Sequence, residues 1–142
     1  MARAHGALAG YVEASVADRG LCLSDFMVLE VLLHKGPMAI SDIGEKVLLA
    51  NASMTSAVDR LERKSLVVRR NSEFDRRAKI VELTSQGRAF ISELYERHVR
   101  DLEVVTNVLS DREKLQLRKL LKKLGRSAET AVELRAASRA RT

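Results

Sequence analysis

The spacing of apolar residues along the chain predicts helices over most of its length. Residues 3–18 are mostly small and compatible with a helix, which Gly20 stops. The next segment, DFMVLEVLLHKG, is apolar on almost every side, so we expect a buried helix that Ser24 caps and that ends at Gly36. A short extended link, MAI, then leads to a third helix, DIGEKVLL, with Ser41 as its N-cap.

A fourth helix, ASMTSAVDRLERKS, has two different faces. Met54, Ala57, Val58 and Leu61 follow the i, i+3, i+4, i+7 spacing of a single apolar face. The rest of the surface begins with small side chains and continues with charged ones. In chain order these residues are Ala52, Ser53, Thr55, Ser56, Asp59, Arg60, Arg63 and Lys64.

A hairpin and two long helices complete the predicted elements. The segments LVVRR and AKIVEL bracket NSEFDRR, which is typical of two antiparallel strands and their connecting tip. Thr84 is the expected N-cap of a helix that runs to about Val108. The sequence SDRE, from Ser110 to Glu113, is a capping box that starts a last helix.

This order of elements predicts a fold that is mainly α with a small β-hairpin wing, a winged helix-turn-helix. We divide the single structural domain into an N-terminal helix (1–20), a winged helix-turn-helix lobe (21–84) and long C-terminal helices (85–142). The long helices are too extended to bury their apolar faces within one small chain. A partner subunit would cover them.

Charge adds a second argument, since the chain of 142 residues carries a formal net charge of +6. Residues 59–79 hold eight basic and four acidic side chains, a local net charge of +4 beside the fourth helix. In a helix-turn-helix the second helix enters the major groove, where small hydroxyls allow close approach and longer cations reach phosphates. The pattern therefore favours double-stranded DNA as a partner.

Several classes of protein are not supported by the sequence. One cysteine, Cys22, excludes an intrachain disulfide framework, and no apolar run or signal segment points to a membrane or to secretion, so we expect a cytoplasmic protein. We find no Ser-His-Asp set, no paired carboxylates in a pocket-like context and no glycine-rich phosphate loop, and therefore predict neither an enzyme nor a cofactor. The three histidines lack metal-ligand spacing, so no metal site is expected.

The segment DRRAKIVELTSQG, from Asp75 to Gly87, resembles the wing signature of the MarR transcription regulators: an Asp-x-Arg, a strand, then Leu-Thr and a following glycine. The preceding segment, from LSDFMVLEVL to LERKSLVVR, resembles the helices that lead to the wing in that family. The resemblance covers roughly residues 20–90. The flanking helices match by layout only.

This resemblance implies a homodimer on a pseudo-palindromic operator, with the first and last helices forming the dimerisation interface. It also implies a regulator, which we expect to be a repressor, controlled by a small-molecule effector or by oxidation. One departure is the first helix, which is shorter than usual in the family. Either the chain begins late or the interface depends more on the C-terminal helices.

The resemblance and the charge pattern together give the expected DNA-binding residues. The wing tip would reach the minor groove or its phosphates, and Asp75 would pair with a neighbouring wing arginine and fix its direction. The expected set is Ser53, Thr55, Ser56, Arg60, Arg63, Arg70, Arg76, Arg77 and Lys79.

A few more residues allow alternative interpretations. Cys22 is a possible oxidation sensor, although a lone cysteine is commonly inert packing. His98 is expected to pack in an interface, and Tyr11 and Tyr95 either pack or line an effector pocket. The polar face of the fourth helix could also dock another protein rather than DNA. That hypothesis predicts that Arg76→Ala and Arg77→Ala leave function intact.

Overall fold

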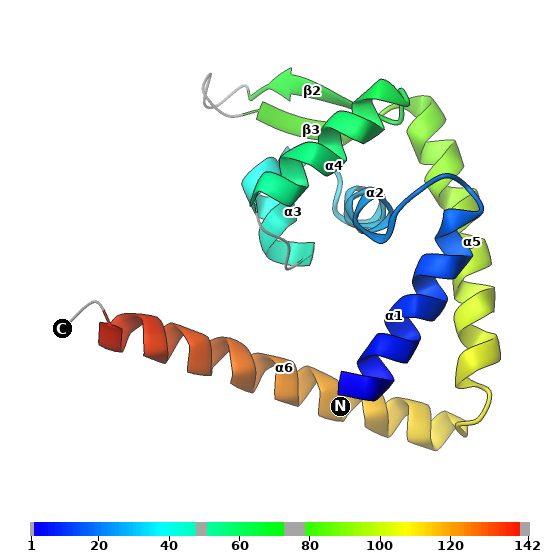
Figure 1. Cartoon of the computed structure of the whole chain (residues 1–142), viewed down its shortest axis with the longest axis vertical. Coiled ribbons are helices and arrows are strands. Elements are labelled where there is room, and N and C mark those ends of the chain that lie inside the picture. The colour runs from blue at the N-terminus through cyan, green and yellow to red at the C-terminus, as the bar shows by residue number, and fades with distance from the viewer. Residues whose placement is uncertain (1, 48–50, 73–78, 140–142) are drawn as a thin grey trace. The chain divides into compact units, whose positions relative to one another are not determined.

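The computed structural model describes residues 2–47, 51–72 and 79–139, and it is built mainly of helices (Figure 1). Two compact units are distinguished, residues 1–102 and 103–142. The elements are α1 (Ala2–Ala17), α2 (Leu23–Lys35), β1 (Met38–Ala39), α3 (Ile40–Val47), α4 (Asn51–Arg63), β2 (Val67–Asn71), β3 (Lys79–Leu83), α5 (Ser85–Thr106) and α6 (Asp111–Arg139). The predicted order of six helices and a hairpin is confirmed, and β1 is an additional strand.

Helix α2 lies at the centre of the first unit, in contact with α1, α3 and α4. Val28, Leu29 and Leu32 are almost completely buried, as the sequence predicts, whereas Met27 and Val31 are half-buried and pack against the same core. The helix ends at Gly36, whose φ of +79° is accessible to glycine at little cost, and whose N–H donates to the carbonyl of Leu32 at 3.0 Å.

Two of the predicted helix caps are wrong. Helix α2 begins at Leu23, so Cys22 occupies the N-cap position without a side-chain cap, and Ser24 lies inside the first turn. Helix α3 begins at Ile40, and Ser41 donates to Asp42 instead of capping the helix. Strand pairing immediately before Ile40 explains the second error, because the chain passes directly from strand to helix.

The sheet has three strands in the order β1-β3-β2, one more than the predicted hairpin. The link Met38–Ala39 is extended as expected, but it also pairs antiparallel with Val81 and Ile80. Strands β2 and β3 form the predicted antiparallel hairpin, with Val67 opposite Leu83. The register sets Asn71 opposite Lys79 at the end nearest the tip. Residues 73–78 of the tip lie outside the described part.

The predicted cap at the start of α5 is confirmed, since Thr84 Oγ1 accepts from the N–H of Gly87 at 2.9 Å. Gly87 packs so closely on the preceding segment that a Cβ there would lie 1.8 Å from the carbonyl oxygen of Leu66. Helix α1 lies beside α5 in the same unit (Figure 1). The turn that follows α1 is tied to α5 by two ion pairs, Arg19–Glu93 at 2.6 Å and Arg97–Asp18 at 3.2 Å.

The last helix, α6, begins at the predicted capping box. The N–H of Ser110 donates to Glu113 Oε2 at 2.8 Å, and the N–H of Glu113 donates back to Ser110 Oγ at 3.4 Å. Helix α6 then continues for 29 residues. Its apolar side chains remain exposed, including Leu115, Leu117, Leu120, Leu121, Leu124, Val132 and Leu134.

Candidate nucleic-acid interface

The two faces predicted for α4 are present. Met54, Ala57, Val58 and Leu61 are completely buried in the core of the first unit. The other side of the helix leaves hydroxyl-bearing and charged residues exposed. They are Ser53, Thr55, Ser56, Asp59 and Arg63. The apolar face of α4 therefore packs on α2 and α3, and the opposite, polar face remains exposed.

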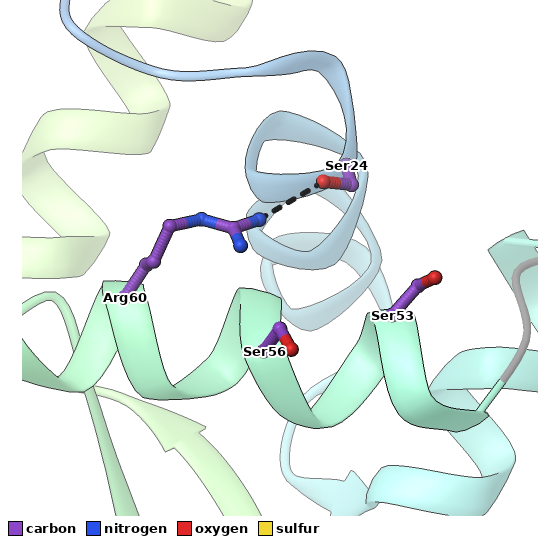
Figure 2. A pocket seen from close by; sticks show the side chains of 4 residues that line it. All are labelled: Ser24, Ser53, Ser56 and Arg60. Atoms are coloured by element: carbon purple, nitrogen blue, oxygen red, sulfur yellow. Dashed lines mark hydrogen bonds between the residues drawn. The ribbon is translucent and has the colours of Figure 1, made fainter.

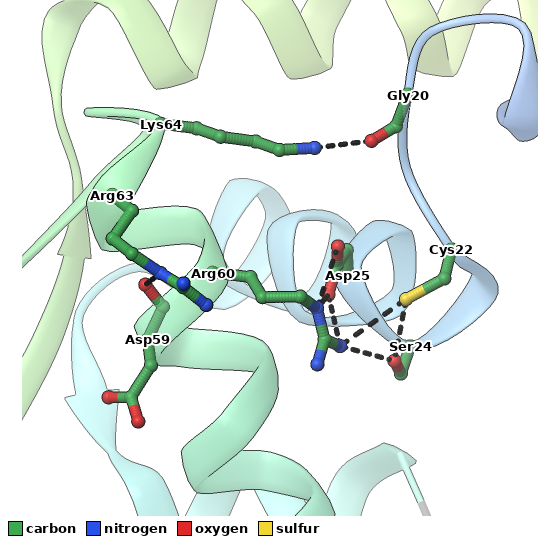
Figure 3. A network of polar contacts seen from close by, with 8 residues as sticks. All are labelled: Gly20, Cys22, Ser24, Asp25, Asp59, Arg60, Arg63 and Lys64. Carbon is green, nitrogen blue, oxygen red and sulfur yellow. Dashed lines mark hydrogen bonds and ion pairs between the residues drawn. The ribbon is translucent and has the colours of Figure 1, made fainter.

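Arg60 is attached to the start of α2. Its Nη2 donates to Asp25 Oδ1 at 2.7 Å and its Nε donates to the same oxygen at 3.1 Å (Figure 3). The Asp25 carboxylate is only 2% exposed, whereas the Arg60 side chain is 36% exposed. Hydrogen bonds with Asp25 raise the pKa of Arg60 above its usual value, although partial burial opposes the shift. A buried carboxylate thus fixes the direction of a guanidinium on α4.

The same guanidinium borders a shallow hollow of about 380 Å³. Ser24 from α2 and Ser53, Ser56 and Arg60 from α4 line it (Figure 2). Arg60 Nη2 donates to Ser24 Oγ at 3.2 Å across one side of this hollow. The sequence predicted three of these four residues and missed Ser24, together with Asp25. The available signal was Asp25 in a helix whose sequence predicts burial, because a buried carboxylate requires a partner.

Arg69, on β2, neutralises both acidic side chains of α4. Its guanidinium contacts Asp59 and Glu62 at 2.5 Å each. Burial lowers the pKa of Arg69, but the hydrogen bond with Asp59 and the attraction of both carboxylates outweigh it, so the net shift is upward. The α4 carboxylates next to the basic hairpin are therefore compensated rather than left as repulsive charges.

The remaining predicted cations differ in their contacts. Arg70 is 69% exposed and its Nε lies 2.5 Å from Glu82 on the neighbouring strand. Lys79 donates to Asn71 at 2.6 Å, and Arg63 Nε donates to the carbonyl oxygen of Asp59 at 3.3 Å. The predicted wing-tip residues Arg76 and Arg77, and the predicted brace Asp75, lie outside the described residues.

A second, more apolar hollow of about 280 Å³ lies between α1, α2 and α5. His98 lines it, is only 7% exposed and packs edge-on against Phe26, with ring centroids 4.8 Å apart. Within the described part of the chain, His98 Nδ1 has no hydrogen-bond partner. The other lining residues are His5, Leu8, Ala9, Val12, Leu23, Met27 and Glu30.

Neither of the tyrosines considered from the sequence lines this hollow. Tyr11 donates to the carbonyl oxygen of Asp101 at 3.1 Å, and the ring of Tyr95 packs edge-on against His34. Cys22 is exposed, with its Sγ 3.1 Å from Ser24 Oγ and 3.3 Å from Arg60 Nη2. Its role as an oxidation sensor stays a prediction.

Metal-binding clusters and membrane-spanning helices are both absent from the described residues. These residues contain no group of three or more His, Cys, Asp or Glu side chains that could hold a metal ion. None of their helices combines the length and the apolar character that crossing a membrane requires.

The chain is similar to known transcriptional regulators. It is 33% identical over 129 residues to the HTH-type transcriptional regulator MhqR of Bacillus subtilis (strain 168), covering 91% of this chain and 89% of MhqR. The crystal structure of the transcriptional regulator BldR from Sulfolobus solfataricus is 27% identical, with a TM-score of 0.78 over 88% of this chain and 89% of BldR.

A third comparison extends the likeness in fold. The structure of Bordetella bronchiseptica BpsR, whose DNA binding is regulated by 6-hydroxynicotinic acid, has a TM-score of 0.79 and 24% identity, over 87% of this chain and 88% of BpsR. The family model for MarR matches residues 21–79, which include the α4 surface and its neighbouring strand. The chain therefore belongs to the MarR family of DNA-binding transcriptional regulators, which are not enzymes.

Proposed function

We propose that the protein is a cytoplasmic repressor that binds a pseudo-palindromic operator as a homodimer and is released by a small-molecule effector. The observation that carries the DNA proposal is the polar face of α4. This face exposes small hydroxyl side chains, and Arg69 neutralises the carboxylates of the helix. Such a helix fits the major groove, because its side chains are short enough for close approach.

The side chains divide into two roles in this proposal. Thr55 and Ser56, on the exposed face of α4, meet base edges. Arg63, Arg70 and Lys79 contact phosphates on either side of the groove, because their longer cationic side chains reach outwards. From the sequence pattern we add Arg76 and Arg77 at the wing tip, with Asp75 as their brace.

Exposed apolar side chains support the homodimer. Val104 and Val108, near the end of α5 and just beyond it, are 67% and 85% exposed, and the leucines of α6 are exposed as well. Leu8 and Tyr11 on α1 are also exposed. Exposed large apolar side chains in such number, as along α6, are normally covered by another protein surface. A second copy of the chain would cover them and would set the spacing of the two α4 helices.

The hollow beside His98 supports the effector proposal. It is lined mainly by apolar side chains, and His98 offers a nearly buried ring nitrogen that lacks a partner within the described residues. A small aromatic effector with one polar substituent suits these walls. The DNA binding of BpsR is regulated by a small aromatic compound, 6-hydroxynicotinic acid. An effector that favours an unsuitable spacing of the two α4 helices would weaken DNA binding about 5- to 150-fold.

The roles of the α4 and hairpin residues can be separated by anisotropy titrations on specific and random duplexes. Lys79→Ala should weaken binding to both and reduce the salt slope by about one unit. Ser56→Ala should change the preferred sequence, at about 1–3 kcal/mol for a lost base contact. Lys122→Ala, an exposed lysine on α6, is the control and should change neither quantity. Equal effects of Lys79→Ala and Ser56→Ala on the two duplexes would refute this division.

A further inference from the structure

We propose that Ser24, Ser53 and Arg60 form a seat for one phosphate of the DNA backbone, with Asp25 as the positioning residue for the guanidinium. The inference rests on the proposed DNA binding and goes beyond it. It adds two α2 residues to the interface and changes the expected role of Arg60 from base contact to backbone contact.

The donors of Arg60 are only partly used. Nε and Nη2 donate to Asp25, and Nη2 also donates to Ser24, whereas Nη1 has no hydrogen-bond partner within the described part of the chain. Nη1 carries two N–H groups, and either of them can donate a charge-assisted hydrogen bond to a phosphate oxygen. Because Asp25 holds the other edge of the guanidinium, these donors are positioned before DNA arrives.

Hydroxyls complete the hollow. Ser53 lies about two helical turns before Arg60 on α4, so the two side chains share one side of that helix. Ser24, on α2, faces the same side (Figure 2). The hydroxyl of Ser53 has no partner within the described residues. Ser24 Oγ accepts from Arg60 and lies 3.1 Å from Cys22 Sγ, and a phosphate oxygen would be a better acceptor than that sulfur for the Ser24 hydroxyl hydrogen. Ser56 also lines the hollow.

The position of the hollow favours a phosphate over a base edge. Its wall on one side is α2, which stands beside α4, whereas base edges lie at the floor of the groove and meet the outer face of the recognition helix. Phosphates line both rims of the groove, where hydroxyl and guanidinium donors commonly bind them. The first turn of α2 would therefore contact the phosphates at one rim of the major groove.

The charge of the seat makes the proposal distinctive. Arg60 and Asp25 form a pair with no net charge, so the seat contributes hydrogen bonds rather than a surplus cation. Ser24→Ala should weaken binding about tenfold at every salt concentration without changing the salt slope. Asp25→Asn should add one net positive charge and make the salt slope steeper by about one unit.

The experiment uses a duplex that the full-length wild-type protein selects from a random pool. Failure to select any duplex would refute the proposed function itself, before the seat is tested. On a selected duplex, neutral methylphosphonate linkages are introduced one at a time. We expect one position in each half-site at which the neutral linkage weakens DNA binding by the wild type about tenfold. At that position the neutral linkage should not weaken DNA binding by Ser24→Ala or Ser53→Ala beyond the loss that the substitution itself causes.

Matched variants decide whether the effect belongs to the seat. Ser127→Ala removes an exposed hydroxyl on α6 and should bind every duplex as the wild type does. Ser24 and Ser53 are not buried, so their variants remain informative if Asp25→Asn fails to fold. Equal sensitivity of wild type and Ser24→Ala at every linkage would overturn the proposal. A second result would also overturn it: millimolar inorganic phosphate displaces DNA from the wild type but not from Ser24→Ala, while both proteins bind DNA with the same affinity. The hollow would then bind a free anion rather than the DNA backbone.

Discussion

At the scale of single residues, contacts determine what a charged side chain can do. Arg60 and Arg70 have the same side chain, yet Arg60 is held by a carboxylate that is almost completely buried, and Arg70 by a partly exposed one on the next strand. A buried carboxylate without its partner is costly, so Asp25 and Arg60 depend on each other. Arg70 forms a surface ion pair with Glu82, and it can exchange that carboxylate for a phosphate at little cost in free energy.

The cap position of α2 provides a stability prediction. Cys22 occupies the N-cap with extended φ and ψ but makes no side-chain cap, which leaves the first backbone N–H groups without that partner. Cys22→Ser should raise the free energy of unfolding by about 0.5–1 kcal/mol, because a serine oxygen accepts such a hydrogen bond. Urea denaturation measures the change. Cys22→Ala is the control, and equal stability of the two variants would contradict the prediction.

At the scale of elements, close packing at Gly87 joins α5 to the entry of the hairpin. A Cβ at this position would lie 1.8 Å from the carbonyl oxygen of Leu66, which is backbone and cannot rotate away. Gly87→Ala should therefore destabilise the protein by about 1–3 kcal/mol. Gly125, inside α6, has nothing within 4 Å of its Cβ position, and Gly125→Ala should stabilise by about 0.5–1 kcal/mol. A melting temperature that changes in the same direction for Gly87→Ala and Gly125→Ala would be inconsistent with this packing.

The capping box of α6 predicts a pH effect. Hydrogen bonds from the Ser110 side chain and backbone lower the pKa of Glu113 below its usual value of 4.5. The contribution of the ionised carboxylate is thus present above about pH 4.5 and is lost as the pH falls through the lower, folded-state pKa. The stability difference between wild type and Glu113→Gln should shrink on acidification. A difference that stays constant from pH 6 to pH 3 would exclude a charged cap.

The sequence was sufficient for three element ends that local chemistry determines, although the predicted Ser24 and Ser41 caps were wrong. The Thr84 cap, the Gly36 terminus and the Ser110 box each depend on residues within one turn, and each is confirmed. Strand β1 was missed as a strand because its pairing with β3 is a tertiary contact. The Asp25–Arg60 pair joins residues 35 positions apart, so no local pattern specifies it. The same limit applies to Ser24, whose hydroxyl bonds to Arg60 rather than to its own helix.

At the scale of the whole molecule, the exposed apolar face of α6 is the basis of the proposed dimer. The wild-type protein should have about twice the chain mass of 15.8 kDa in light scattering. Leu124→Glu should shift it towards the monomer, because a carboxylate would have to be buried in the interface. Lys123→Glu, at an exposed neighbouring position, should leave the dimer intact. Monomeric wild-type protein at micromolar concentration would contradict the proposal.

The central claim is that this chain recognises a specific DNA sequence. Fluorescence anisotropy with the DNA upstream of its own gene and with random duplex, each at two salt concentrations, tests it most directly. We predict tighter binding to the upstream DNA, with affinity for both duplexes falling as salt rises, because cationic side chains release counterions from phosphates. Micromolar or weaker, salt-insensitive binding to both duplexes, with a folded dimer verified, would contradict this claim.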